Sequence, residues 1–409
     1  MHRPAALGGA PAFAPDAFPA WPQWTDDERT GLTAALDEGL WGSSRARRAA
    51  DFAADFARFQ GAAIGLPMAN GTCTLEAALV ACGVGEGDEV VVPALTFAAT
   101  AVAVLRVNAV PVVADVDPDS LCLVPEHVEA ALTPRTRAVI AVHLAGAMAA
   151  TDRLAALCAA RGIDLIEDSA HAHGSRLLGR GAGSWGVFGS FSFQQSKLLT
   201  AGEGGALITS DPARAETARS YANCGRRTGG ATYEHVRLGV NYRMTEWQGA
   251  VLAAQLRRYP AQLARREEGA RHLGAALAAT AGLRPQGRDP RMDRSAYYAY
   301  VLHYDPEAFG GLPAARFSAA LAAEGVPVAT PYPALNRLDM FAAGAAAPAP
   351  PTAAERVRAA VCPAAERAAQ TTVWLHHRLL LAPPDRLARV AEACDRIRRA
   401  AGRLSAVGG

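Results

Sequence analysis

Apolar residues follow two different spacings along the chain, and the changes between them mark the expected elements. From about residue 60 to 210, short runs rich in β-branched residues, such as DEVVVPALTF and RAVIAVHLAG, alternate with segments of helical spacing. Such regular alternation predicts a parallel sheet covered by helices on both faces. The runs FGSFSF and GGALITS follow one another closely and predict two further strands.

The pattern differs on either side of this α/β region. The first 25 residues are rich in Pro and Trp and predict an extended arm, and two amphipathic helices follow it. After residue 245, one long helical segment leads into a second α+β block that contains SAYYAYVLHY and EGVPVATPY as strands and closes with an amphipathic helix. Within this block, AAGAAAPAPPTAAE is of low complexity and predicts a mobile loop.

These patterns predict an α/β fold with a mainly parallel central sheet in a large domain and a smaller C-terminal α+β domain. We expect an N-terminal arm at residues 1–25, the large domain at 26–255 and the smaller domain at 256–409.

Composition narrows the class of partner. Half of the residues are hydrophobic, a fifth are charged and the formal net charge is +2, without a sustained basic stripe. Nucleic acid and anionic membranes are therefore not expected as partners. We expect no transmembrane helix, because no apolar run approaches 18 residues, and no export signal. Seven scattered cysteines without a CxxC pair favour reduced thiols in a cytoplasmic protein.

The basic residues include a single lysine. Lys and Arg total 41, and Lys197 in FSFQQSKLLTAGEGG is the one lysine among them. A lysine amine condenses with an aldehyde to form a Schiff base, whereas a guanidinium does not do so usefully. The alternative is a chance surface lysine. Because a strand-like FSF precedes Lys197 and a glycine-rich AGEGG follows it, the sequence favours a catalytic lysine.

Asp168 ends the buried run in IDLIEDSAHAHG, at the carboxyl end of a predicted strand, where open α/β sheets bind ligands. A carboxylate there can hold the pyridine nitrogen of a pyridoxal ring protonated, which makes the ring an electron sink. A helix cap is the alternative. Together with Lys197, the residue favours pyridoxal 5'-phosphate as the cofactor.

A phosphate site is expected where NGTCTLEAAL opens a helix after a strand. The free N–H groups of a helix start attract anions, which makes Gly71 and Thr72 candidate phosphate ligands. Ser192, five residues before Lys197, is a candidate hydroxyl donor. The alternatives are a plain Asn-Gly turn and a core serine.

Three other motifs are weak evidence for a cofactor or metal site. GAGSWG, at residues 181–186, matches a dinucleotide fingerprint but precedes a strand rather than a helix, so we interpret it as a turn. His171 and His173 have no nearby third ligand, and no metal site is expected. His376 and His377 are similarly weak as metal ligands, although either can line a substrate pocket.

The sequence resembles the DegT/DnrJ/EryC1/StrS aminotransferases, pyridoxal-phosphate enzymes of fold type I that act on keto-sugars and keto-cyclitols. The motifs that carry the resemblance run nearly end to end and include NGTCTLEAAL, VVVPALTFAAT, EDSAHAHG, FSFQQSKLLTAGEGG and LGVNYRMTEWQGAVLAAQL. The intervals of 29 residues from Asp168 to Lys197 and of 5 from Ser192 to Lys197 match the family pattern.

The resemblance implies a role for each matching residue. Lys197 would hold the cofactor as a Schiff base and transfer protons, and Asp168 would pair with the pyridinium nitrogen. Phe97 would stack on the cofactor ring, and His171 would lie near the ring hydroxyl. The phosphate would be bound by Gly71, Thr72 and Ser192. Asn241 would contact the phosphate of the neighbouring subunit's cofactor. The last contact implies a homodimer with shared active sites. His171 stands where the family commonly has Gln, so its hydrogen bonding depends on its tautomer.

The variant SFQxxKLLTAGEGG and the tail VWLHHRLLL are most similar to the branch that acts on cyclitols and antibiotic precursors. This resemblance implies transfer of an amino group from L-glutamine or L-glutamate to a cyclic ketone, with Tyr332, His376 and His377 near the substrate. One alternative is an aromatising dehydration like that of 3-amino-5-hydroxybenzoate synthases. A non-catalytic scaffold is the other, and retention of Lys197, Asp168 and Ser192 argues against it.

Overall fold

The computed structural model describes residues 3–42, 45–231, 233–342 and 351–406. A seven-stranded sheet forms its centre, and every strand runs in the same direction except β9, which is antiparallel to both of its neighbours. In spatial order the strands are β1 (Ile64–Met68), β9 (Gly205–Thr209), β8 (Phe188–Ser192), β5 (Asp164–Asp168), β4 (Thr136–Val142), β2 (Glu89–Pro93) and β3 (Val110–Ala114). The predicted, mainly parallel sheet is confirmed.

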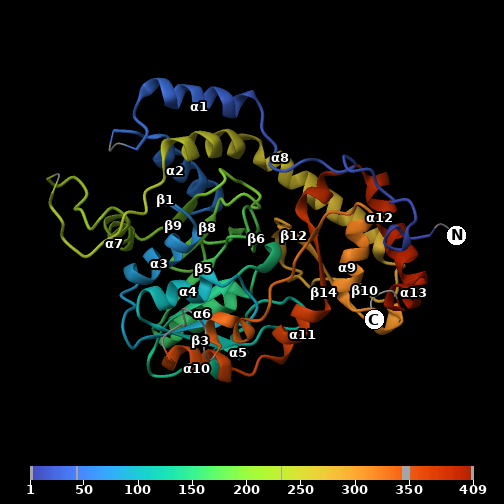
Figure 1. Ribbon diagram of the computed structural model, residues 1–409. Helices are drawn as coiled ribbons and strands as arrows, with labels where there is room; N and C mark the ends of the chain where they lie inside the picture. Colours follow the sequence, from blue (N-terminus) through green and yellow to red (C-terminus); the bar gives the residue numbers. More distant parts are fainter. Residues whose placement is uncertain (1–2, 43–44, 232, 343–350, 407–409) are drawn as a thin grey trace.

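Helices pack on both faces of this sheet (Figure 1). Successive residues of a strand point to opposite faces, so in β4 Ala138 and Ile140 join one core while Val139 and Ala141 join another. One face is covered by α3 (Gly71–Ala81), α4 (Ala99–Arg106), α7 (Pro212–Ala222) and α10 (Pro351–Ala359). The other is covered by α2 (Arg48–Gln60), α5 (Pro125–Ala131), α6 (Thr151–Arg161) and the start of α8 (Glu246–Leu277).

The long helix α8 connects the sheet region to the C-terminal block, and α1 (Asp26–Glu38) lies along its first half (Figure 1). The boundary predicted between residues 255 and 256 therefore falls inside one helix, and the division into domains stays a prediction. A four-stranded antiparallel sheet forms the centre of the C-terminal block, with β10 (Leu283–Pro285), β12 (Ala299–Tyr304), β14 (Thr372–His376) and β13 (Val328–Ala329) in spatial order.

Further helices surround this second sheet, and a small third sheet lies beside it. The helices are α9 (Ala314–Ala323), α11 (Pro363–Thr371), α12 (Pro384–Arg399) and α13 (Ala401–Ala406). The third sheet contains β11 (Met292–Arg294), β6 (Arg176–Leu177) and β7 (Arg180–Gly181). Short 3-10 helices occur at η1 (Ala5–Leu7), η2 (Leu144–Gly146), η3 (Glu307–Phe309), η4 (Leu335–Arg337), η5 (Asp339–Phe341) and η6 (His377–Leu381).

The N-terminal arm is packed against the C-terminal block. Leu7, Phe13 and Phe18 are buried in that block's core. The Glu324 carboxylate accepts hydrogen bonds from the backbone N–H groups of Ala5 and Ala12 at 3.0 and 2.9 Å. The arm is therefore anchored by both apolar burial and a buried carboxylate.

The prediction of a mobile loop at residues 342–355 is wrong from Pro351 onwards. There the chain forms α10, whose Ala354 and Val357 pack into the core of the large sheet. Proline is favourable in the first turn of a helix, and Ala, Glu and Arg are good helix formers, which explains why a low-complexity composition still folds. Residues 343–350 lie outside the described residues.

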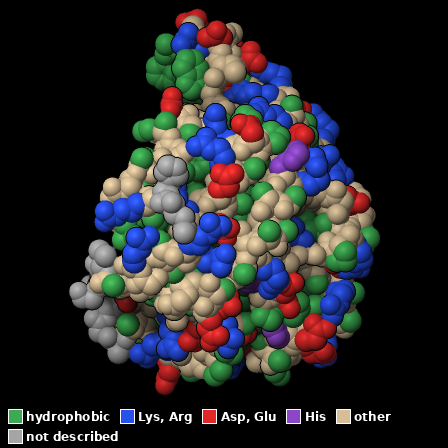
Figure 2. Space-filling model, turned by 90° about the vertical axis from the view of Figure 1, so that its right-hand side faces the viewer, with side chains coloured by type: hydrophobic (Ala, Val, Ile, Leu, Met, Phe, Trp, Pro, Cys, Tyr) green, Lys and Arg blue, Asp and Glu red, His purple; other side chains and the backbone are tan. Residues whose placement is uncertain are grey.

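Charges of both signs are interspersed over the face drawn in Figure 2, with no broad patch of one sign. Within the described ranges, none of the helices combines the length and the apolar character that a membrane span requires.

Candidate active site

A cavity of about 710 Å³ opens at the carboxyl ends of the parallel strands. This placement follows from topology, because the ends of β5 and β8 and the start of α3 meet at one edge of the sheet. The cavity brings together eight of the predicted site residues, Gly71, Thr72, Phe97, Asp168, His171, Ser192, Lys197 and Tyr332.

The Asp168 carboxylate faces this cavity and is 7% exposed. The Thr100 hydroxyl donates to its Oδ2 at 2.9 Å, and the Ala170 N–H donates to its Oδ1 at 3.2 Å. Burial raises the pKa of Asp168 above its ordinary value, while these two donors and the charge of Lys197 act in the opposite direction. A cation placed against the carboxylate would favour its ionised form.

The start of α3 forms the second part of the site. Asn70 caps the helix, its Oδ1 accepting the Cys73 N–H at 2.9 Å. The N–H groups of Gly71 and Thr72 have no partner within the helix because of their position in its first turn. A Cβ at residue 71 would lie only 2.8 Å from the Ser192 Cβ, so glycine allows Ser192 to approach the helix start. The three residues thus form one small concave surface suited to an anion.

Lys197 lies between this surface and a wall of aromatic rings. Its side chain is 9% exposed, and Nζ lies 4.5 Å from the centre of the Tyr298 ring. The Tyr298 hydroxyl is 2.9 Å from Ser196 Oγ. The amine is therefore held next to a polarisable face, to which an ammonium group is attracted.

His171 continues the same wall. Its ring stacks on Tyr298 with centroids 3.8 Å apart, and its Nε2 lies 3.2 Å from the Tyr332 hydroxyl. The Ala145 N–H donates to its Nδ1 at 3.3 Å, so Nε2 carries the proton of the neutral ring. Burial, followed by the charge of Lys197, lowers the pKa of His171 well below its ordinary value. The contacts thus assign the tautomer on which its predicted role depends.

Three of the predicted site residues lie outside the cavity. Asn241 is exposed on the segment before α8 and pairs with Asn223 in an isolated bridge. His376 and His377 lie behind Tyr298 and Tyr332, where they line a separate cavity of about 50 Å³. The larger cavity lies on the other side of Tyr298 and Tyr332 from these two histidines, and their proximity to the substrate stays a prediction.

Sequence reasoning missed a polar cluster on another side of the cavity. The Glu76 carboxylate, 3% exposed, is 3.1 Å from Arg106 Nε. It also accepts hydrogen bonds from the hydroxyls of Tyr221 and Tyr242 at 2.5 and 3.0 Å. Arg106 and Tyr242 line the cavity with Glu76. Two of the quoted motifs contain Glu76 and Tyr242, but no local pattern connects them to Arg106 and Tyr221, which come from other segments.

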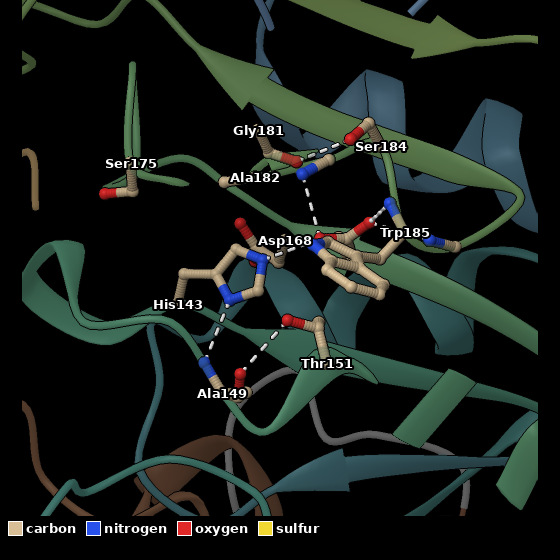
Figure 3. A network of polar contacts seen from close by, with 12 residues as sticks. His143, Ala149, Thr151, Asp168, Ser175, Gly181, Ala182, Ser184 and Trp185 are labelled. Atoms are coloured by element: carbon tan, nitrogen blue, oxygen red, sulfur yellow. Dashed lines mark hydrogen bonds and ion pairs between the residues drawn. The ribbon is translucent and has the colours of Figure 1, made fainter. Parts of the chain in front are cut away.

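The glycine-rich turn predicted at residues 181–186 is confirmed, and its backbone N–H groups bind an internal carboxylate (Figure 3). Gly183 donates to Glu167 Oε2 at 2.8 Å, and Trp185 and Gly186 both donate to Oε1 at 2.7 Å. His143 Nε2 is 2.9 Å from the same carboxylate. Since the Ala149 N–H donates to His143 Nδ1, Nε2 carries the proton and donates to Glu167.

Among the described residues, no cluster of three or more His, Cys, Asp or Glu side chains is arranged to hold a metal ion. The cavity presents an amine, a carboxylate, an anion-binding helix start and aromatic rings. This set matches the family resemblance, and comparison with known proteins tests that resemblance directly.

The model of the DegT/DnrJ/EryC1/StrS aminotransferase family matches residues 22–395. The chain belongs to this family. Its relatives include the 3-amino-5-hydroxybenzoate synthase of Amycolatopsis mediterranei (strain S699), 41% identical over 390 residues that cover 94% of this chain and 98% of the relative. The L-glutamine:scyllo-inosose aminotransferase of Streptomyces griseus is 39% identical over an alignment of 422 positions, which covers 97% of this chain and 98% of that relative.

The fold of the aminotransferase is also found in solved structures. The crystal structure of a 3-amino-5-hydroxybenzoic acid synthase superposes with a TM-score of 0.85 at 40% identity and covers 95% of this chain and 100% of that one. The predicted fold type I architecture is therefore confirmed, and the enzyme is an aminotransferase rather than a non-catalytic scaffold.

Proposed function

We propose that this aminotransferase uses pyridoxal 5'-phosphate to move an amino group from L-glutamine or L-glutamate to a keto-cyclitol or keto-sugar in antibiotic or other secondary-metabolite biosynthesis. Its main support is the single cavity that holds the Lys197 amine, the Asp168 carboxylate and the anion-binding start of α3. Relatives named as L-glutamine:scyllo-inosose and L-glutamine:2-deoxy-scyllo-inosose aminotransferases support the proposed substrates.

The residues present fit the cofactor. The concave surface of Gly71, Thr72 and Ser192 suits its phosphate, since a Cβ at residue 71 would fill it. Asp168 suits its pyridine nitrogen, and Phe97, 58% exposed at the cavity, offers a ring for stacking. When bound, the cofactor supplies an aldehyde that accepts amines and a ring that withdraws electrons.

The protein's own groups then have defined tasks. Lys197 would hold the cofactor through Nζ, and its free amine would take up the proton that leaves the α-carbon of the amino donor. An ionised Asp168 carboxylate would keep the pyridine nitrogen of the bound cofactor protonated. His171, neutral and donating from Nε2 to Tyr332, keeps the wall beside Lys197 uncharged.

We also propose a homodimer in which Asn241, which is exposed on the segment before α8, reaches the neighbouring subunit's phosphate. We further propose a cytoplasmic location, which agrees with seven cysteines that are all free thiols.

Lys197 provides a direct test of the proposal. Adding pyridoxal 5'-phosphate to the cofactor-free enzyme should produce a visible absorption band, and borohydride followed by peptide mass spectrometry should locate the cofactor on Lys197. Incubation with α-15N-labelled L-glutamine and scyllo-inosose should then give a labelled amine. An enzyme that neither binds pyridoxal phosphate nor transfers the label to any cyclic ketone would contradict the proposal.

A second candidate reaction is an aromatising dehydration on the same scaffold. It is favoured by the identity of 41% to a 3-amino-5-hydroxybenzoate synthase over 94% of the chain. This reaction would give an ultraviolet-absorbing product from an amino-dehydroshikimate-like compound and would move no label from glutamine. The two assays therefore separate the candidates.

A further inference from the structure

A buried guanidinium lies behind the aromatic wall of the cavity. Arg266, on α8, is fully buried, and its Nε, Nη1 and Nη2 atoms have no hydrogen-bond partner among the described residues. Its guanidinium carbon lies 5.1 Å from the centre of the Trp21 ring, which comes from the N-terminal arm. Trp21 in turn meets the His377 ring edge-on, with centroids 4.5 Å apart. An unpaired buried charge acts strongly on its neighbours, because the interior screens it little.

Two buried histidines contact the two ends of residues 192–196, the segment that leads to Lys197 and that we call the lysine segment. His173 Nε2 lies 3.0 Å from the carbonyl oxygen of Ser192, and His377 Nε2 lies 3.1 Å from the carbonyl oxygen of Ser196. A carbonyl oxygen only accepts hydrogen bonds, so both Nε2 atoms must carry a proton. The Nδ1 atoms of both rings are buried without a hydrogen-bond partner.

The charges around the two rings keep them neutral. Burial first, and then the charges of Lys197 and Arg266, lower the pKa of His173 to about 3. Burial, Arg266, His376 and Arg378 lower the pKa of His377 well below its ordinary value. Nearby positive charge disfavours a second proton on Nδ1, so each ring stays neutral and donates from Nε2 to its carbonyl.

We propose that His173 and His377 are positioning residues for Lys197, which hold the carbonyls of Ser192 and Ser196 at the two ends of residues 192–196, and that Arg266, buried against Trp21 beside His377, disfavours a second proton on the His377 ring. His173 and His377 belong to distant parts of the chain. Arg266 belongs to α8, and Trp21 belongs to the N-terminal arm. The lysine segment is thereby connected to α8, to the C-terminal block and to the N-terminal arm. This inference rests on the proposed role of Lys197.

The single lysine makes the first test specific. In the cofactor-free protein, trinitrobenzenesulfonate labels only Lys197 and the terminal amine, so its rate of reaction at Lys197 is followed by peptide mass spectrometry. His377→Leu removes the donor and should accelerate amide exchange in residues 193–200 roughly tenfold, with a changed rate of Lys197 labelling. His377→Gln retains an N–H donor and should restore both rates to within about twofold of wild type.

His272→Leu is the matched control, since His272 lies on α8 beside Glu268 with 33% of its side chain exposed. It should alter neither rate. If His377→Leu and the corresponding His173→Leu both leave exchange and labelling at the wild-type rates, the proposal is overturned. A general loss of folding in the leucine variants, without rescue by glutamine, would likewise point to a merely structural role.

A second measurement reports the protonation of the two rings in the wild-type protein itself. Nitrogen-15 spectra of histidine-labelled wild-type protein should show His173 and His377 as neutral rings protonated at Nε2 near neutral pH, with the signals assigned through the glutamine variants. A ring protonated at Nδ1 in either position would refute the proposal. Both experiments use cofactor-free protein, so their failure is distinguishable from a failure of amine transfer, which the labelled-glutamine assay measures.

Discussion

Replacing Gly71 with alanine tests whether the start of α3 and Ser192 form one phosphate site. The new Cβ would lie 2.8 Å from Ser192 Cβ and 3.3 Å from Ser192 Cα. Because carbon atoms pack best at about 3.5–4.0 Å, the helix start would have to move by roughly 0.7–1.2 Å. Overpacking of this kind costs about 1–3 kcal/mol of folding stability. Losing one N–H donor to a charged phosphate costs about 1.5–3 kcal/mol, which corresponds to about 10- to 150-fold weaker cofactor binding.

Calorimetric titration with pyridoxal 5'-phosphate measures the affinity, and urea unfolding measures the stability. Gly85→Ala is the matched control, since nothing lies within 4 Å of a Cβ at residue 85. In the double variant with Ser192→Gly the clashing Cβ is absent, so stability should recover while affinity stays low because the serine hydroxyl is lost. If Gly71→Ala binds the cofactor with wild-type affinity, the helix start is not the phosphate site.

Three further predictions follow from single groups. Burial raises the folded-state pKa of Asp168, so the stability linked to this group is fully present below the unfolded pKa of about 3.9 and is lost as the pH rises through the folded value. Cofactor-free Asp168→Asn should therefore be more stable than wild type at neutral pH and should lose this advantage near pH 4. Urea unfolding at the two pH values measures the difference in stability. Equal stability of the two proteins at neutral pH would contradict the raised pKa. Glu167→Gln places an NH2 group against backbone N–H donors and should cost about 1–3 kcal/mol per donor left unpaired, measured by thermal unfolding. Lys197→Arg retains the charge but not the reactive amine, so it should fold normally and lose the visible band and all turnover, and residual turnover would show that another group carries the chemistry.

The candidate site residues whose places in the fold follow from the sequence are those at strand ends. Asp168 and Ser192 end β5 and β8, and Gly71 begins α3, so the parallel order of the strands alone brings them to one edge. Lys197 was recognisable because its chemistry cannot be performed by arginine. These residues needed only local patterns and one rule of topology.

Contacts between distant segments could not be predicted in this way. The Glu76 carboxylate meets Tyr221 and Tyr242, which are 145 and 166 residues away. The resemblance of the tail VWLHHRLLL to the cyclitol branch implies a place for His377 near the substrate. Which side of the aromatic wall it occupies depends on how β14 packs against β12, and no local pattern contains that information.

The sequence excludes residues 181–186 as a dinucleotide-binding motif, but it does not predict what the glycines of this turn do in the structure. A Cβ at Gly186 would lie 2.2 Å from the Leu165 carbonyl oxygen, and one at Gly183 would lie 2.8 Å from the Phe191 ring, so both positions require glycine. Close packing there brings backbone N–H groups onto Glu167. Because Glu167 and Asp168 are consecutive on β5, their side chains point to opposite faces. The turn therefore anchors the back of the strand end from which Asp168 faces the cavity, and the glycines serve the site through packing instead of by binding a ligand.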